Sequence, residues 1–97
     1  MKFEVRFLNA VRRDLRRLDR NVQQIIQEKH LPQILQDPHQ ASTLRQDLKG
    51  LKSYHFSHQG VQYRIVYEIY QDNALVIILF IGSRENLYDQ VRQRLQR

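Results

Sequence analysis

The sequence predicts an α+β fold in which one strand precedes two helices, a meander of three strands and a short final helix. Three observations predict this fold. Lys2–Leu8 alternates apolar and polar residues, and residues 9–37 repeat apolar side chains at helical spacing. Alternation then returns in Ser53–Ser57 and Val61–Tyr70, while Ala74–Ile81 is almost wholly apolar. We therefore expect a twisted, mainly antiparallel sheet that carries the two N-terminal helices on one face.

The N-terminal half is predicted to form a half-buried strand and a helical hairpin. Lys2–Leu8 supplies the strand. Asn9 is expected to cap the first helix and Asn21 the second, because asparagine accepts hydrogen bonds from the first turn. Pro32 should kink or restart the second helix, and the Asp37-Pro38 pair should end it. The apolar positions of the two helices are Val11, Leu15 and Leu18, then Val22, Ile25, Ile26, Ile34 and Leu35.

The segments outside the helical hairpin and the meander are a loop and a C-terminal helix. Residues 38–50 are predicted to be a loop in which Leu44 and Leu48 turn inward. Arg84–Arg97 is predicted to be an amphipathic helix, because apolar residues recur at four-residue spacing. That stripe is narrow, so we expect the helix to dock weakly. It consists of Leu87, Val91 and Leu95.

The register of the first hairpin follows from its turn. Gln59-Gly60 is the nearest pair that contains the glycine favoured by a two-residue turn. This turn pairs Tyr54 with Ile65 and Phe56 with Tyr63, which creates one apolar face for the helices to cover. A slip of one residue would pair apolar with polar side chains on both faces. The other face then pairs His55 with Arg64 and Ser57 with Gln62.

A group of polar and cationic side chains is expected on that second face, which we predict to be uncovered. It presents His55, Ser57, Gln62, Arg64 and Glu68, together with the less polar Val66 and Tyr70. Arg84 follows the last strand, just past Gly82. Tyr88 lies about a hundred degrees away from the apolar stripe of the last helix. Two arginines, a histidine and a tyrosine are therefore expected to converge at one edge of the sheet.

Composition limits the classes of function. A chain of 97 residues forms a single domain, and the absence of cysteine excludes disulfides and thiolate chemistry. Sixteen Lys and Arg against ten Asp and Glu give a net charge of +6, which favours a polyanionic partner. The N-terminus shows no leader pattern, and the longest apolar run is too short to span a bilayer, so we expect a cytoplasmic protein.

Three short motifs in this order resemble the RelE/ParE superfamily of bacterial type II toxins. The first is Leu48-Lys49-Gly50, and the second is the strand Tyr63-Arg64-Ile65-Val66-Tyr67. The third is Gly82-Ser83-Arg84 with Leu87-Tyr88 behind it. The order of elements also matches, so the resemblance covers essentially the whole chain as one RelE-like toxin domain, residues 1–97.

The resemblance implies a ribosome-dependent endonuclease that cuts mRNA through attack of a 2′-hydroxyl on the adjacent phosphate, without metal or cofactor. Arg64, Arg84 and Tyr88 match the family's catalytic positions, and His55 and Ser57 stand where RelE-like members carry lysines. Arginine suits a phosphate because its planar fork binds two oxygens, and histidine titrates near neutrality, so His55 is the candidate base. RNA-binding residues are expected at Lys49, Lys52, Ser57 and Gln62.

The resemblance also implies a cognate antitoxin, which is acidic, partly disordered and DNA-binding. Partners of the toxin itself would be the ribosomal A site and mRNA, with no membrane. Two other functions stay open. One is a ParE-like inhibitor of DNA gyrase, which shares the fold but performs no chemistry. The other is a basic RNA- or ribosome-binding domain without catalytic activity.

Overall fold

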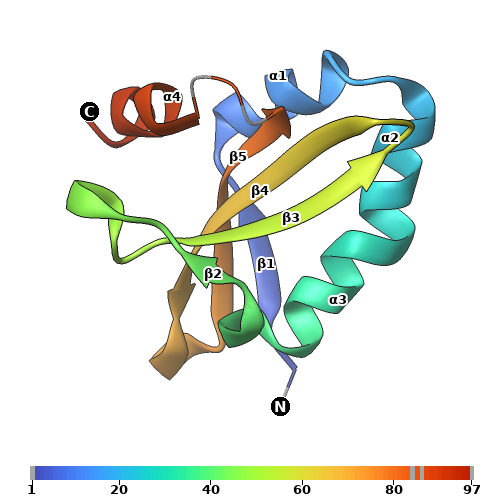
Figure 1. Ribbon diagram of the computed structural model, residues 1–97. Helices are drawn as coiled ribbons and strands as arrows, with labels where there is room; N and C mark the ends of the chain where they lie inside the picture. Colours follow the sequence, from blue (N-terminus) through green and yellow to red (C-terminus); the bar gives the residue numbers. More distant parts are fainter. Residues whose placement is uncertain (1, 84, 86, 97) are drawn as a thin grey trace.

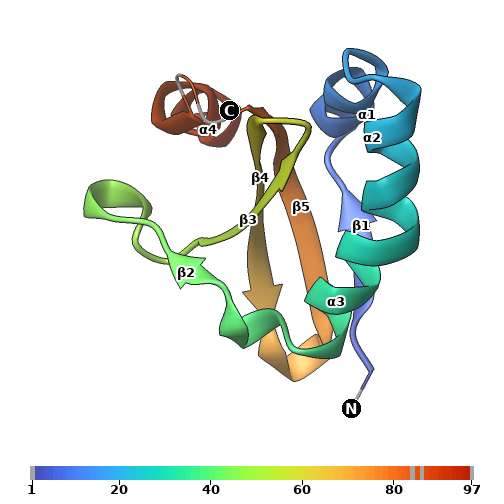
Figure 2. The same ribbon diagram turned by 45° about the vertical axis from the view of Figure 1, so that its right-hand side comes forward.

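The computed structural model describes residues 2–83, 85 and 87–96. They form one sheet with helices on both of its faces. The sheet contains five strands in the order β1-β5-β4-β3-β2. Helices α1, α2 and α3 cover one face, and α4 lies on the other (Figures 1 and 2). The strands are β1 (Glu4–Phe7), β2 (Ser42–Thr43), β3 (Lys52–His58), β4 (Val61–Tyr70) and β5 (Leu75–Ser83). The helices are α1 (Asn9–Arg16), α2 (Arg20–Ile25), α3 (Leu31–Gln36) and α4 (Leu87–Leu95).

The sheet confirms the predicted fold and hairpin register. β3 pairs antiparallel with β4, with Tyr54 opposite Ile65 and His55 opposite Arg64. The turn places Gln59 and Gly60 at φ 50° and 82°. A two-residue turn with positive φ at both residues matches the twist of the two strands. Glycine adopts positive φ without steric strain because it has no Cβ. β4 and β5 are also antiparallel, whereas the edge strand β1 runs parallel to β5.

The two predicted asparagine caps are wrong. Leu8 precedes α1 and Asp19 precedes α2, and neither contributes a side-chain cap. Asn9 is instead the first residue of α1, and Asn21 lies inside α2. Helix ends of this kind are held by packing of the apolar stripe rather than by local capping.

The second helix restarts at Pro32, one of the two outcomes expected there: a π-helical turn ends just before it, and Pro32 lies in the first turn of α3. The turn spans Ile26–His30, and the Leu31 N–H donates to the carbonyl of Ile26, five residues back. In this wider turn the backbone hydrogen bonds span five residues instead of four. The turn ends just before the proline, which has no N–H to donate. The helical arm therefore continues through α3 and ends at Asp37, as predicted.

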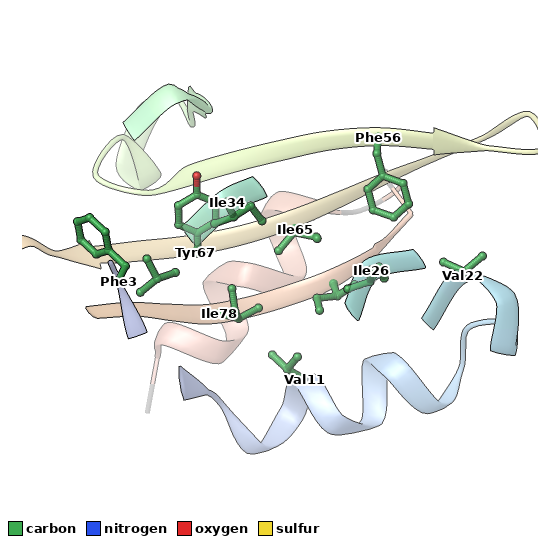
Figure 3. Packing of buried hydrophobic residues seen from close by; sticks show 11 residues of the cluster. Phe3, Val11, Val22, Ile26, Ile34, Phe56, Ile65, Tyr67 and Ile78 are labelled. Carbon is green, nitrogen blue, oxygen red and sulfur yellow. The ribbon is translucent and has the colours of Figure 1, made fainter. Parts of the chain in front are cut away.

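The main core lies between the sheet and helices α1–α3. Ile65, Tyr67 and Ile78 of the sheet are fully buried against Val11, Val22, Ile26 and Ile34 of the helical layer (Figure 3). Tyr67 reaches across this core, and its hydroxyl donates to the carbonyl of Pro38 at 2.6 Å. Burial of so much apolar surface, at about 25 cal/mol per Å², is the main source of stability for a domain of this size.

The second face of the sheet is covered in its middle, contrary to the prediction. Val66 of β4 and Leu79 and Phe80 of β5 are buried there beneath Leu87 and Val91 of α4. A β-bulge between Val66 and Tyr67 makes this possible, because the extra residue turns both Leu79 and Phe80 toward α4. Leu44, Leu48 and Leu51 complete this second cluster.

The segment predicted as a loop between the helices and β3 contains short regular elements. It includes β2, which pairs with the start of β3, and 3-10 turns at Pro38–Gln40 and Gln46–Leu48. Leu44 and Leu48 are buried as predicted. A two-residue strand is too short for an alternation pattern to reveal it in the sequence.

The C-terminal helix is held by more than its apolar stripe. Leu87 and Val91 are buried, but Leu95 is 46% exposed. The Arg94 guanidinium donates to both oxygens of Asp14 at 2.6 Å and to the carbonyl of Leu79 at 2.9 Å. This ion pair connects α4 to α1 across the end of the sheet, so the docking is firmer than the stripe predicts. None of the helices in the described part of the chain has the length and apolar character needed to cross a bilayer.

His30 is expected to make the stability of the fold depend on pH. Its ring is buried, stacks on Phe56 at 4.0 Å and forms a hydrogen bond of 2.8 Å with the Tyr54 hydroxyl. Burial, with added repulsion from Lys29 and His58, lowers the pKa of His30 below 6.5. The unfolded chain therefore binds more protons below pH 6.5, and the free energy of unfolding should fall there by up to about 1.4 kcal/mol per pH unit.

Urea unfolding at pH 7.5 and pH 5.5 measures this loss. His30→Gln should reduce the difference between the two pH values, and the same substitution at the exposed His39 should not. Equal pH dependence in wild type and His30→Gln would contradict the assignment.

Candidate functional site

Arg64 lies near the centre of the polar group predicted on the second face. On β4 it stands between His55 of β3 and Gly82 of β5, its register partners on either side. Its side chain is half-buried, and one guanidinium nitrogen donates to the Ser53 hydroxyl at 3.4 Å. A guanidinium positioned by a strand and a buried serine is a preorganised cation, which is what binding of a phosphate requires.

His55 is the titratable group beside this cation. It is exposed and lies directly opposite Arg64, where paired Cβ atoms are about 5 Å apart. Partial burial and the positive charge of Arg64 both lower the pKa of His55 below 6.5. The imidazole is therefore mainly neutral at pH 7, and a neutral imidazole can accept a proton.

Ser57 and Gln62 form the next pair toward the hairpin turn. They face each other across β3 and β4, and both are exposed. Alternation places them on the same face as His55 and Arg64, one pair further along the strands. They extend the polar surface toward the turn, with hydroxyl and amide groups but no charge.

Gly82 leaves room beside Arg64 for an aromatic ring. A Cβ at this position would lie 2.9 Å from the Cζ atom of Phe80. The Phe80 ring thus occupies the space that a side chain of residue 82 would need. The guanidinium of Arg94 lies 5.2 Å from the centre of the same ring. The glycine of the Gly82-Ser83-Arg84 motif therefore has a packing role next to the candidate site.

Tyr88 is oriented by contacts with the loop before β3. Its hydroxyl accepts a hydrogen bond of 2.9 Å from the Arg45 N–H, which leaves its own hydrogen available to donate. Arg92, one turn later, lies 5.4 Å from the Tyr88 ring centre and holds both oxygens of Asp47 at 2.8–2.9 Å. These contacts fasten α4 to the 3-10 turn Gln46–Leu48.

The two candidate lysines differ in their surroundings. Lys49 is exposed at the end of that 3-10 turn. The Lys52 ammonium donates to the carbonyls of His39 and Ala41 at 3.1 Å and to the Thr43 hydroxyl at 3.3 Å. Those three acceptors match the three donors of an ammonium group. Lys52 therefore anchors the loop to β3, and only Lys49 presents its charge outward.

Arg84 lies outside the described residues, so its place in the site stays a prediction. The residues that sequence reasoning missed are the partners that fix the site: Arg45, Asp47, Arg92 and the Asp14–Arg94 pair. Asp14 carried a signal, because it falls between Val11 and Leu15 on the buried side of α1, where an acid needs a partner. Within the described residues, no group of three or more histidines and acids has a geometry suited to a metal ion.

Taken together, the fold and this face define a small basic α+β protein whose sheet carries Arg64 and His55 side by side on the face of α4. The model of the ParE-like toxins of type II bacterial toxin-antitoxin systems matches residues 5–92. The chain belongs to this family and is a type II toxin of the RelE/ParE superfamily. Among curated proteins, none matches the sequence significantly.

Solved structures of RelE toxins share the fold. The toxin-antitoxin complex RelBE2 from Mycobacterium tuberculosis contains a chain that is 28% identical, with a TM-score of 0.72 over 87% of this chain and 100% of that one. A free mutant of Escherichia coli RelE is 21% identical, with a TM-score of 0.78 over 98% of this chain and 99% of that one. The intact E. coli RelBE complex gives 20% identity and a TM-score of 0.67, over 88% and 99%.

Proposed function

We propose that this toxin is an endoribonuclease that cuts mRNA in the ribosomal A site and so inhibits translation in the cytoplasm. The observation that supports this best is the pairing of a preorganised arginine with a neutral histidine, Arg64 and His55, on neighbouring strands. Cleavage of RNA through its own 2′-hydroxyl requires a base, a cation at the phosphate and a donor for the leaving oxygen. We assign these tasks to His55, to Arg64 with Arg84, and to Tyr88, in a reaction that uses no metal.

In the proposed reaction, His55 accepts the proton of the 2′-hydroxyl as its oxygen attacks the adjacent phosphorus. Arg64, with Arg84, stabilises the negative charge that gathers on the phosphate oxygens. Tyr88 donates its hydroxyl proton to the departing 5′-oxygen or stacks on a base. The P–O5′ bond breaks as the P–O2′ bond forms, so the products end in a 2′,3′-cyclic phosphate and a 5′-hydroxyl. Lys49, Ser57 and Gln62 contact the RNA around this centre, and Lys52 supports the loop that carries Lys49.

Incubation with translating ribosomes tests the proposal. Mapping the mRNA ends should reveal cuts in phase with codons for the wild type and far fewer for Arg64→Ala and His55→Ala. The new ends should carry a 5′-hydroxyl. Absence of codon-phased cuts in the wild type would refute the nuclease.

The rate of cleavage should depend on pH through His55. Its lowered pKa means that activity should rise with pH at the acidic end and level off by about pH 7. Single-turnover rates on programmed ribosomes between pH 5 and 8 measure this profile. His55→Gln should be slow and lack the acidic limb, whereas His39→Gln, which changes an exposed histidine on another part of the surface, should reproduce the wild-type profile. An unchanged limb in His55→Gln would assign the base to another group.

A second candidate function is inhibition of DNA gyrase, and the ParE-like family match favours it. A gyrase inhibitor needs a binding surface but no base and no proton donor. Loss of supercoiling activity of gyrase in the presence of the toxin, without any mRNA cleavage, would support this alternative over the nuclease.

We also propose that an antitoxin neutralises this toxin. Solved structures of relatives include complexes of RelE with RelB. The net charge of +6 suits an acidic, partly disordered segment that folds on binding. A gene for a small DNA-binding protein beside the toxin gene, whose product forms a stable complex with the toxin, would support this partner.

A further inference from the structure

A pocket of about 300 Å³ opens at the end of the sheet between α1 and α4. Its lining includes Arg17 and Leu18, which directly follow α1, and Val61 and Tyr63 of β4. Ser83 of β5 and Gln90 of α4 also line it. Asp14 of α1 also lines the pocket, and its ion pair with Arg94 joins α1 to α4 beside it.

The pocket adjoins the candidate site directly. Gly82, which contributes to its lining, is the register partner of Arg64, and Ser83 is the partner of Tyr63. Neighbouring strands lie about 4.8 Å apart. Gly82 shares its face with Arg64, whereas Val61 and Tyr63 project from the other face, so the pocket lining includes residues of both faces of the sheet. A strand of RNA whose phosphate is held by Arg64 would cross Gly82 of β5 to reach it.

The chemistry of the lining suits an unpaired base. Val61 is 44% exposed, although it is a large apolar residue. The half-buried Tyr63, which also lines the pocket, stacks one face of its ring on Phe56 with centroids 5.2 Å apart, so only the other face could meet a base. RNA-binding proteins hold splayed-out bases by such stacking and read their edges with polar groups. The Gln90 amide carries both a donor and an acceptor, as the edge of a base does.

The charge of the lining suits RNA as well. Arg17 brings a guanidinium that can bind a flanking phosphate or stack on the base. Asp14 also lines the pocket, but its carboxylate accepts from both terminal nitrogens of Arg94 and from the Ile81 N–H. The carboxylate is therefore compensated and offers little repulsion to an anion.

We infer that this pocket receives one nucleobase of the RNA, from a nucleotide near the bond that is cut, and contributes to the choice of codon. This inference rests on the proposed nuclease function. Val61 and Tyr63 stack on the base, Gln90 reads its edge, and Arg17 holds the neighbouring phosphate. The ligand is thus an unpaired nucleotide of the substrate strand.

Abasic scanning on ribosomes tests the inference independently of cleavage. Ribosomes are programmed with mRNA that carries a 2′-deoxynucleotide at the cleaved position and one abasic nucleotide at successive positions, and toxin affinity is measured. One abasic position should weaken the wild type roughly tenfold, the effect of one base–aromatic stack. Val61→Asn and Gln90→Ala should lose most of that penalty. Gln93→Ala, an exposed glutamine on the same helix, should keep it.

Cleavage profiles separate failure of this inference from failure of the nuclease itself. Val61→Asn, Gln90→Ala and Arg17→Ala should change the ranking of cleaved codons, whereas Arg13→Ala removes the same charge outside the pocket and should keep the ranking. Unchanged codon ranking together with an unchanged abasic penalty would overturn the pocket assignment alone. A wild type that binds ribosomes but never cuts mRNA would overturn the nuclease, and the abasic scan would still decide whether the pocket takes a base.

Discussion

Arg64→Ala is expected to reduce codon-directed cleavage on ribosomes by about 10²- to 10³-fold, the usual loss when one preorganised donor to the transition state is removed. The guanidinium is half-buried between two strands and is positioned by Ser53, so water cannot replace it at the same place. Arg64→Lys keeps the charge but loses the planar fork, and it should lie between alanine and wild type. Single-turnover rates on programmed ribosomes measure the effect.

A matched control distinguishes a specific role of Arg64 in catalysis from a general effect of removing one positive charge. Arg6 is also a strand arginine, but it is exposed on the edge strand β1, two strands away from Arg64, and its partner is Glu4 at 3.6 Å. Arg6→Ala should cleave within a few-fold of wild type. If Arg64→Ala folds normally by circular dichroism and still cleaves like Arg6→Ala, Arg64 does not stabilise the transition state.

Short-range patterns in the sequence were enough to predict the pairing of β3 with β4. The period of two in Tyr54–Phe56 and Tyr63–Ile65, together with one glycine-containing turn, allows a single register with a continuous apolar face. Because register also decides which side chains share the other face, the pairing of His55 with Arg64 followed from the same pattern. That part of the candidate site could be predicted from the sequence alone.

Features that depend on contacts between distant segments could not be predicted in the same way. The bulge that buries Leu79 and Phe80 on the same face breaks the period of two, so alternation could not reveal the cover over the second face. Lys52 looks like a free cation in the sequence, yet its three acceptors come from residues 39–43, which pack against it only in the fold. Distances between such groups are set by tertiary packing, which overrides local pattern.

The attachment of α4 shows which interactions a sequence pattern reveals and which it does not. Its apolar stripe predicted weak docking, because hydrophobic contact was the only attachment that the sequence pattern could reveal. The stronger attachment is an ion pair between residues 14 and 94, which lie at opposite ends of the chain. Such a pair stabilises the fold only when burial, geometry and additional hydrogen bonds coincide, and these can be judged only in three dimensions.

Arg94→Met is therefore expected to lower the free energy of unfolding by about 3–5 kcal/mol, because it leaves the Asp14 carboxylate buried without its cation. The Asp14 side chain is 4% exposed and that of Arg94 is 15% exposed. In a domain of this size the loss corresponds to a fall in Tm of roughly 12 °C or more. Urea or thermal unfolding followed by circular dichroism measures it. Arg92→Ala, which breaks the exposed pair with Asp47, should cost much less.

The double variant Asp14→Leu with Arg94→Met distinguishes an uncompensated charge from a general loss of packing. If the buried carboxylate causes the damage, removing it should recover part of the stability that Arg94→Met loses, since apolar replacements of buried pairs are often tolerated. Recovery should stay incomplete, because the Ile81 N–H and the Leu79 carbonyl lose their side-chain partners. A double variant less stable than Arg94→Met would show that the two side chains stabilise the fold mainly through their hydrogen bonds to β5. The attachment of α4 would then depend mainly on these hydrogen bonds to the backbone of β5, and the attraction between the two charges would contribute less.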